Sequence, residues 1–189
     1  MGSFTIPRLS PRAALALSLA LVLATAAVLL WMGRSPGEIR LWHGGKADAG
    51  VSQHLTDFYT YSHLVRGVVL YWLLWAAFRG RLSVAARLVI AVLIEGAWEI
   101  VQNTPFIVDR YRTQAISPGY GDAVINSAGD MLAAMLGFLA ASRLPAWVTV
   151  MLLIAVEVVL FRTIGDNLLL SLAMQLYPLE WVSQWQLHR

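Results

Sequence analysis

The sequence predicts an all-α fold, a polytopic transmembrane helical bundle of about five spans followed by a short C-terminal interfacial helix. Of its 189 residues, 58% are hydrophobic and 13% are charged, whereas soluble domains carry about 25% charged residues. The apolar residues form long continuous runs, which favours helices over the alternating strands of a membrane barrel. We therefore expect a single transmembrane domain over residues 1–189.

The first apolar run covers residues 13–32. Its length of about 20 residues suffices to cross roughly 30 Å of hydrocarbon. The segment Ala24-Thr25-Ala26 has the small-x-small pattern of a cleavage site, but a signal peptide has a shorter apolar core of about 7–15 residues. We expect an uncleaved helix.

Four further spans and a tail follow the first run. The expected spans cover residues 59–78, 84–103, 122–142 and 146–161, and the expected outer loops cover residues 33–58 and 104–121. Pro105 ends the third span, because the residue before a proline avoids helical angles. The apolar residues 168–176, with Trp181 and Trp185, are too short to span again and predict an interfacial helix.

The loop charges predict the topology. Short segments beside helix ends carry arginine without acidic neighbours: Arg8, Arg12, Arg79, Arg81, Arg87 and Arg143. Because cytoplasmic loops are enriched in Lys and Arg, we expect a multi-pass protein of the cell inner membrane with a cytoplasmic N-terminus and a periplasmic C-terminus.

Composition excludes several kinds of site and partner. The chain has no cysteine, which excludes disulfides, thiol catalysis and Cys-ligated metals. Its net charge is +3, but the basic residues are scattered, so membrane lipids are the expected partners and nucleic acid is not. No metal or cofactor is assigned, and the oligomeric state is not predicted.

Charged residues inside predicted spans are costly and therefore indicate function or pairing. The third span carries Glu95, Glu99 and Asn103, which lie on one helix face because they are spaced four residues apart. At about 1.5 Å per residue from the outer end, Glu99 is about 6 Å deep and Glu95 about 12 Å deep.

The fourth span repeats the pattern with Asp122, Asn126 and Asp130, and the second span places His63 and Arg66 in the same outer half. Asn126 and Asp130 lie about 6 and 12 Å deep, matching the depths on the third span. We therefore predict one polar cavity that opens outward.

Two arginines of the following loop, Arg110 and Arg112, lie just outside the predicted cavity. Arginine binds phosphate or carboxylate through paired donors, although ordinary headgroup contact explains them equally well. The candidate binding residues are His63, Arg66, Glu95, Glu99, Asn103, Asp122, Asn126, Asp130, Arg110 and Arg112; no catalytic residue is named.

Each candidate also has a purely structural interpretation. Glu95 can form an ion pair with Arg66, Asp122 can cap a helix, and His63 can be a structural hydrogen-bonding group. Convergence of carboxylates and amides from two helices nevertheless favours a functional cavity. A row of small residues on the fourth span, Gly129, Ala133 and Gly137, would allow a second helix to approach closely.

Three segments carry a resemblance to known proteins. LWHGGKADAGVSQHLTDFYTYSH, VQNTPFIVDRYR and GYGDAVINSAGD resemble a small group of uncharacterised bacterial multi-pass inner-membrane proteins. This resemblance covers most of the chain beyond the first span and implies location and topology rather than an activity. The group is expected to carry an acid before the asparagine, where this sequence has Gln102.

A shorter resemblance links the third and fourth spans to VanZ-like membrane proteins. Glu99, Gln102, Arg110 or Arg112, and the pattern Asp122, Asn126, Gly129 are similar to that family's acid, glutamine, arginine and D-x-x-x-N-x-x-G, whereas Ala133 replaces the next glycine. The resemblance implies a role in the cell envelope and no particular reaction.

Three functions remain open. The preferred one is a binding or structural protein of the cell envelope whose outward cavity holds a small polar ligand or an amphiphile headgroup. An intramembrane enzyme could use Glu95, Glu99 and Asp130 as an acid–base set. A cation or proton-coupled transporter could use the same carboxylates with His63. The sequence has no G-x-S-x-G, H-E-x-x-H or phosphate-binding glycine loop.

Overall fold

The computed structural model describes residues 9–46, 48–78, 81–111 and 121–188. These residues form eight α-helices and no strand, which confirms the all-α class. The helices are α1 (Pro11–Trp31), α2 (Phe58–Phe78), α3 (Val84–Gln102), α4 (Pro105–Tyr111), α5 (Val124–Ala141), α6 (Ala146–Ile164), α7 (Leu168–Leu176) and α8 (Glu180–Leu187). The sequence interpretation missed α4 inside the second outer loop, and it expected one helix in the tail, which holds two.

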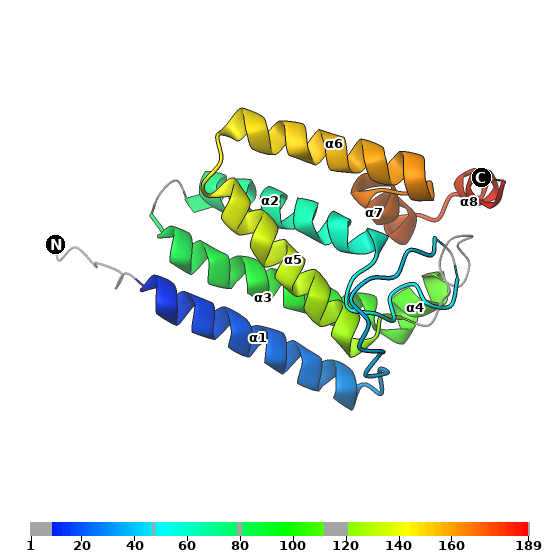
Figure 1. Ribbon diagram of the computed structural model, residues 1–189, viewed down its shortest axis with the longest axis horizontal. Helices are drawn as coiled ribbons and strands as arrows, with labels where there is room; N and C mark the ends of the chain where they lie inside the picture. Colours follow the sequence, from blue (N-terminus) through cyan, green and yellow to red (C-terminus); the bar gives the residue numbers. More distant parts are fainter. Residues whose placement is uncertain (1–8, 47, 79–80, 112–120, 189) are drawn as a thin grey trace.

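Five long helices pack lengthwise and the remaining elements gather at one end (Figure 1). Helix α5 is central, because it packs against α1, α2, α3 and α6. Loop 33–57, α4, α7 and α8 lie at the right-hand end in Figure 1, whereas the start of α1 and the turn between α5 and α6 lie at the opposite end.

Three of the long helices are long and apolar enough to cross a membrane: α1, α5 and α6. The expectation of five spans is therefore not confirmed. Helices α2 and α3 have 21 and 19 residues, which is sufficient length. However, α3 carries Arg87, Glu95 and Glu99, and α2 carries His63 and Arg66 among aromatic residues.

Local sequence signals explain where several helices begin and end. The side chains of Ser10, Ser83 and Asn167 cap α1, α3 and α7 by accepting hydrogen bonds from backbone N–H groups three residues later. Helix α6 ends at Gly165, whose φ of 72° lies in the left-handed region that glycine adopts without strain.

Small residues bring α2 and α5 into close contact, as the sequence predicted for the α5 row. A Cβ atom on Gly67 of α2 would lie 2.0 Å from the carbonyl oxygen of Ala134, and one on Gly137 of α5 would lie 2.0 Å from that of Leu64. The two helices therefore touch through their backbones. This contact sets the short distance between polar side chains one to two turns away.

Backbone hydrogen bonds fasten loop 33–57 to the start of α5. The N–H of Ala123 donates to the carbonyl of Ser52 at 2.8 Å, and the N–H of Val124 donates to the carbonyl of Ser35 at 2.9 Å. The Gln53 amide donates to the carbonyl of Gly121 at 3.1 Å. The loop is therefore a fixed cover over one end of the bundle.

Candidate functional site

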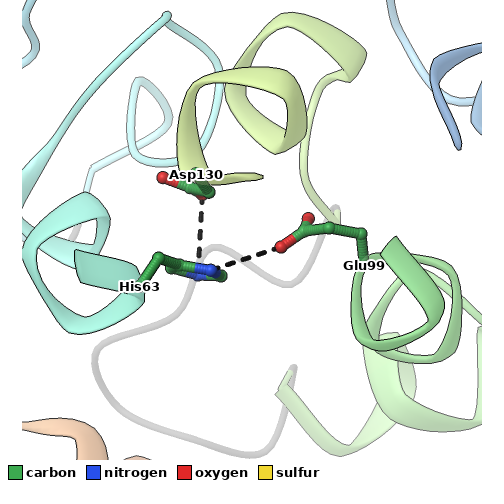
Figure 2. A group of neighbouring side chains, drawn as sticks. All are labelled: His63, Glu99 and Asp130. Atoms are coloured by element: carbon green, nitrogen blue, oxygen red, sulfur yellow. Dashed lines mark ion pairs between the residues drawn. The ribbon is translucent and has the colours of Figure 1, made fainter. Parts of the chain in front are cut away.

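The predicted polar residues of α2, α3 and α5 converge in the bundle interior. Figure 2 shows the ring of His63 on α2 between the carboxylates of Glu99 on α3 and Asp130 on α5. The three side chains are at most 5% exposed. Together with Glu95 and Arg66 they form what we call the carboxylate cluster.

Both ring nitrogens of His63 face carboxylate oxygens. Its Nδ1 lies 2.6 Å from Oε1 of Glu95 and 3.3 Å from Oε1 of Glu99. Its Nε2 lies 3.6 Å from Oδ2 of Asp130. A neutral imidazole that donates from Nδ1 to the nearer oxygen leaves Nε2 without a proton, whereas a protonated ring donates through both nitrogens.

Arg66 supplies the fixed positive charge of the cluster. Its Nη1 lies 3.0 Å from Oε1 of Glu95, so the ion pair that the sequence suggested is present. The guanidinium also lies over the ring of Trp98, 4.7 Å from its centroid. This stacking holds the long side chain in place beside the carboxylates.

A second group of polar residues lies at the outer end of α3. The Gln102 amide donates to Oδ2 of Asp122 at 2.5 Å, and the Asn103 amide donates to the same oxygen at 3.3 Å. Asp122 returns a backbone N–H to Oδ1 of Asn103 at 2.8 Å. Asp122 is therefore not the N-cap that its position suggested; Ala123 occupies that position.

Gln102 joins this outer group to the carboxylate cluster, since its amide also lies 3.3 Å from Oε2 of Glu99. The candidate binding residues did not include Gln102, because it lies outside the four-residue spacing of Glu95, Glu99 and Asn103. The sequence did contain a signal for Gln102. It lies three residues after Glu99, and residues three apart share a helix face.

Two other candidates, Asn126 and Arg110, lie outside the cluster. The Asn126 amide donates to the carbonyl of His54 at 2.9 Å, so it fastens the outer loop to α5. Arg110 donates to the carbonyl of Gln175 at 2.6 Å and stacks on Phe106, which places it against the tail. Arg112 lies outside the described residues.

Two residues that the sequence interpretation did not select connect the cluster to the loop. The Thr60 hydroxyl accepts the backbone N–H of Asp57 at 3.1 Å and hydrogen-bonds to Asp130. Burial raises the pKa of Asp57, and the nearby charge of Asp122 adds to the rise, although the backbone N–H groups of Ser52 and Tyr59 lower it. The sequence could have indicated Asp57, because it lies directly before a helix, where an aspartate often caps the helix N-terminus.

A pocket of about 290 Å³ opens beside the cluster, between α2, α5 and the outer loop. Its lining is mostly apolar: Trp42, Leu55, Thr56, Asp57, Thr60, Tyr61, Leu64, Gly129, Leu132, Ala133 and Leu136. The carboxylates of Glu95, Glu99 and Asp130 do not line it. The predicted outward-opening polar cavity is thus replaced by a closed cluster, with Thr60 between it and the pocket.

Several buried oxygens of the cluster have no hydrogen-bond partner among the described residues: Oε2 of Glu95, Oε1 of Glu99 and Oδ1 of Asp130. Oε1 of Glu99 contacts His63 only as an ion pair at 3.3 Å. Buried polar atoms without partners are rare because each costs about 1–3 kcal/mol. The cluster therefore has unused capacity to bind a positive group.

Comparison with known proteins gives a family and no activity. Residues 29–188 match the family described as "Protein of unknown function (DUF2585)". The chain belongs to the DUF2585 family.

Similar proteins occur in several bacteria. The chain is 47% identical to a "UPF0314 protein" of Paracoccus denitrificans, covering 88% of this chain and 89% of the relative. It is 43% identical to a UPF0314 protein of Agrobacterium fabrum, covering 88% and 86% of the two chains. It is 46% identical to one of Novosphingobium aromaticivorans, covering 87% of each. No solved structure matches the chain significantly.

These relatives confirm the resemblance to an uncharacterised bacterial family, since UPF0314 proteins carry no activity in their name. The names do not state a membrane location. The resemblance to VanZ-like proteins gains no support and stays a prediction.

Proposed function

We propose that this DUF2585 protein is a multi-pass protein of the bacterial inner membrane that binds a small amphiphile in the pocket between α2, α5 and loop 33–57. The observation that carries the proposal is the pocket itself. Its wall of leucines meets a polar end formed by Thr56, Asp57 and Thr60. Ligand sites of this kind combine an apolar lining with a few oriented polar groups.

The surface of the molecule supports a membrane location. Apolar side chains are exposed along the outward faces of α1 and α6: Leu15, Leu17, Leu19, Leu23 and Leu30 on α1, and Val150, Met151, Leu152, Ile154, Val158 and Val159 on α6. In water such continuous stripes would favour aggregation, whereas lipid solvates them.

Aromatic residues support the same location. Trp31 ends α1 and Trp147 begins α6, and both are largely exposed. The end of α1 and the start of α6 lie toward opposite ends of the bundle (Figure 1). Tryptophan is enriched at both membrane–water interfaces, so these positions fit a bundle that crosses the bilayer with its loop-covered end outward.

The polar end of the pocket supports recognition of a headgroup. Thr60 hydrogen-bonds to Asp130, so a group that binds at Thr60 is one side chain away from the carboxylate cluster. Both carboxylate oxygens of Asp57 already accept backbone N–H groups, from Ser52 at 2.7 Å and from Tyr59 at 2.8 Å. An uncharged or cationic headgroup fits these surroundings better than an anionic one.

Native mass spectrometry of the detergent-purified protein tests the proposal. Ala133→Phe fills the pocket, and Val158→Phe adds the same bulk on the exposed face of α6, away from the pocket. We expect an amphiphile retained by the parent and by Val158→Phe, and at least tenfold less retention by Ala133→Phe. Equal retention by both variants, or none by the freshly extracted parent, would contradict amphiphile binding in this pocket.

A second candidate is an intramembrane carboxylate-dependent enzyme. It is favoured by the position of His63 between Glu99 and Asp130, one hydrogen-bonded residue from the pocket wall, because acid–base catalysis needs titratable groups within reach of the ligand. In the same experiment, an enzyme would retain a species of different mass in Asp130→Asn than in the parent. A pure binding protein would retain the same species in both.

A further inference from the structure

We propose that His63, Glu99 and Asp130 form a binding site for a divalent first-row transition-metal ion. The inference does not depend on the amphiphile pocket. The three residues come from α2, α3 and α5, so an ion bound here would tie together three helices of the bundle (Figure 2).

The ligand atoms already lie near the spacing that an ion requires. One atom from each residue can be chosen so that all lie within 4.8 Å of one another. Metal–ligand bonds of about 2.0–2.2 Å allow two ligand atoms at most about 4.4 Å apart. Neighbouring ligands of a tetrahedral ion lie closer, about 3.5 Å apart, so side-chain movements of about 1 Å would complete the site.

Glu95 orients the imidazole in the way that metal sites require. A metal-binding histidine usually donates its other ring N–H to a carboxylate, which fixes the ring. Nδ1 of His63 lies 2.6 Å from Oε1 of Glu95. Nε2 then faces Oδ2 of Asp130 at 3.6 Å, a separation that suits two ligands of one ion.

The unpartnered oxygens provide independent support. Oε1 of Glu99 and Oδ1 of Asp130 are buried, have no hydrogen-bond partner among the described residues, and belong to the side chains that converge on His63. A metal ion bound to Oε1 of Glu99 and chelated by both oxygens of Asp130 would satisfy them without further donors. A purely structural ion pair would leave them unsatisfied, at a cost in stability.

Charge balance also favours an ion. Glu95, Glu99 and Asp130 bring three negative charges, whereas Arg66 brings one positive charge. Protonated His63 would still leave a net charge of −1. A divalent ion bound to neutral His63 makes the cluster neutral overall, which lowers the cost of burying it.

The ligand types select the class of metal. One imidazole with two carboxylates suits borderline ions such as Mn²⁺, Fe²⁺ or Zn²⁺. Mg²⁺ and Ca²⁺ prefer all-oxygen surroundings and usually keep several waters, which a cluster at most 5% exposed leaves little room for.

Titration of the chelator-treated, full-length protein with Co²⁺ tests the site, because bound Co²⁺ absorbs visible light according to its ligands. We expect one Co²⁺ per chain and a higher melting temperature in detergent. Glu99→Gln and Asp130→Asn should weaken binding at least tenfold. Glu157→Gln is the control, because Glu157 is a buried carboxylate on α6 outside the cluster, and it should bind like the parent.

Absence of a Co²⁺ spectrum in the folded parent would overturn the proposal, as would unchanged affinity in both Glu99→Gln and Asp130→Asn. If either variant fails to fold, Mn²⁺ electron paramagnetic resonance and the Co²⁺ spectrum of the parent still decide, since a spectrum without imidazole ligation excludes His63. The two proposals can fail separately. If the metal-free parent retains an amphiphile but binds no Co²⁺, the metal site is wrong and the pocket proposal still holds.

Discussion

Nδ1 of His63 lies 2.6 Å from Oε1 of Glu95, and both side chains are almost completely buried. The two residues are 32 positions apart in the sequence and belong to different helices, α2 and α3. Their contact forms inside an apolar bundle, where a charge without a partner is expensive. The energetics of the cluster therefore depend on the balance of its charges.

Removing the positive charge of Arg66 should destabilise the protein more than removing a carboxylate. Arg66→Gln leaves Glu95, Glu99 and Asp130 together with one titratable partner, and we expect a loss of about 3 kcal/mol, as for other broken buried pairs. Glu95→Gln lowers the excess of negative charge, so its loss should be smaller. Melting temperatures in detergent compare the two variants, and an equal or larger loss for Glu95→Gln would contradict the imbalance.

Glu99→Gln should leave the metal-free protein as stable as the parent or slightly more stable. Glutamine keeps the shape of the side chain and removes a buried charge whose Oε1 has no hydrogen-bond partner among the described residues. Asp130→Asn should have the same effect on stability. In ligand retention, the double variant should be little worse than either single variant, because the effects of residues that act as a unit are not additive. The melting temperatures of both single variants in the presence of a chelator check the prediction. A much lower melting temperature than the parent's in each would show that the carboxylates have a structural role.

The all-α class and the convergence of His63, Glu95, Glu99 and Asp130 could be predicted from the sequence, because four-residue spacing fixes the face of a helix. The close approach of another helix to the small-residue row of α5 could also be predicted, and Gly137 does contact the backbone of Leu64 on α2.

The role of the remaining residues depended on contacts distant in sequence. Asn126 has the same spacing as Asp130, yet its amide turns to the carbonyl of His54 in a loop 72 residues earlier. Asp122 resembles a cap, but Gln102 and Asn103 on another helix bind its carboxylate. Periodicity specifies the helix face and not the partner, so these assignments required the structure.

Adding a methyl group at the α2–α5 contact should destabilise the protein. Gly67→Ala and Gly137→Ala each place a Cβ atom 2.0 Å from a backbone carbonyl oxygen of the other helix, so the helices must separate, at a cost of about 1–3 kcal/mol. Gly44→Ala in the exposed loop meets only the Trp42 side chain at 3.3 Å and serves as the control. Melting temperatures within error of the control for both variants would disprove the close contact.

The C-terminus should lie in the periplasm. The turn with Arg143 lies at the end of the bundle opposite to α7 and α8 (Figure 1), and arginine-rich turns favour the cytoplasm. Alkaline phosphatase is active only outside the cytoplasm. Fusions at Gly45 and after residue 188 should therefore be active, and fusions at Arg81 and Arg143 inactive. The reverse pattern in stably inserted fusions would overturn the topology, and an active Arg81 fusion would show that α2 does not cross.

Asp166, at the end of α6, should make the protein less stable as the pH rises. Burial raises the pKa of Asp166 to about 6, although hydrogen bonds from Ser171 and Asn167 oppose the rise. Because the folded-state pKa lies above the unfolded value of about 3.9, the stabilising contribution is complete below pH 4 and is lost as the pH rises through 6, up to about 3 kcal/mol. Asp166→Asn should therefore melt near the parent at pH 4.5 and several degrees above it at pH 7.5.

Asp48→Asn is the control with the opposite shift. Backbone hydrogen bonding at Gly50 lowers the pKa of exposed Asp48, so removing this carboxylate should not raise the melting temperature at pH 7.5. A pH-independent difference between Asp166→Asn and the parent would show that Asp166 stays ionised in the folded state.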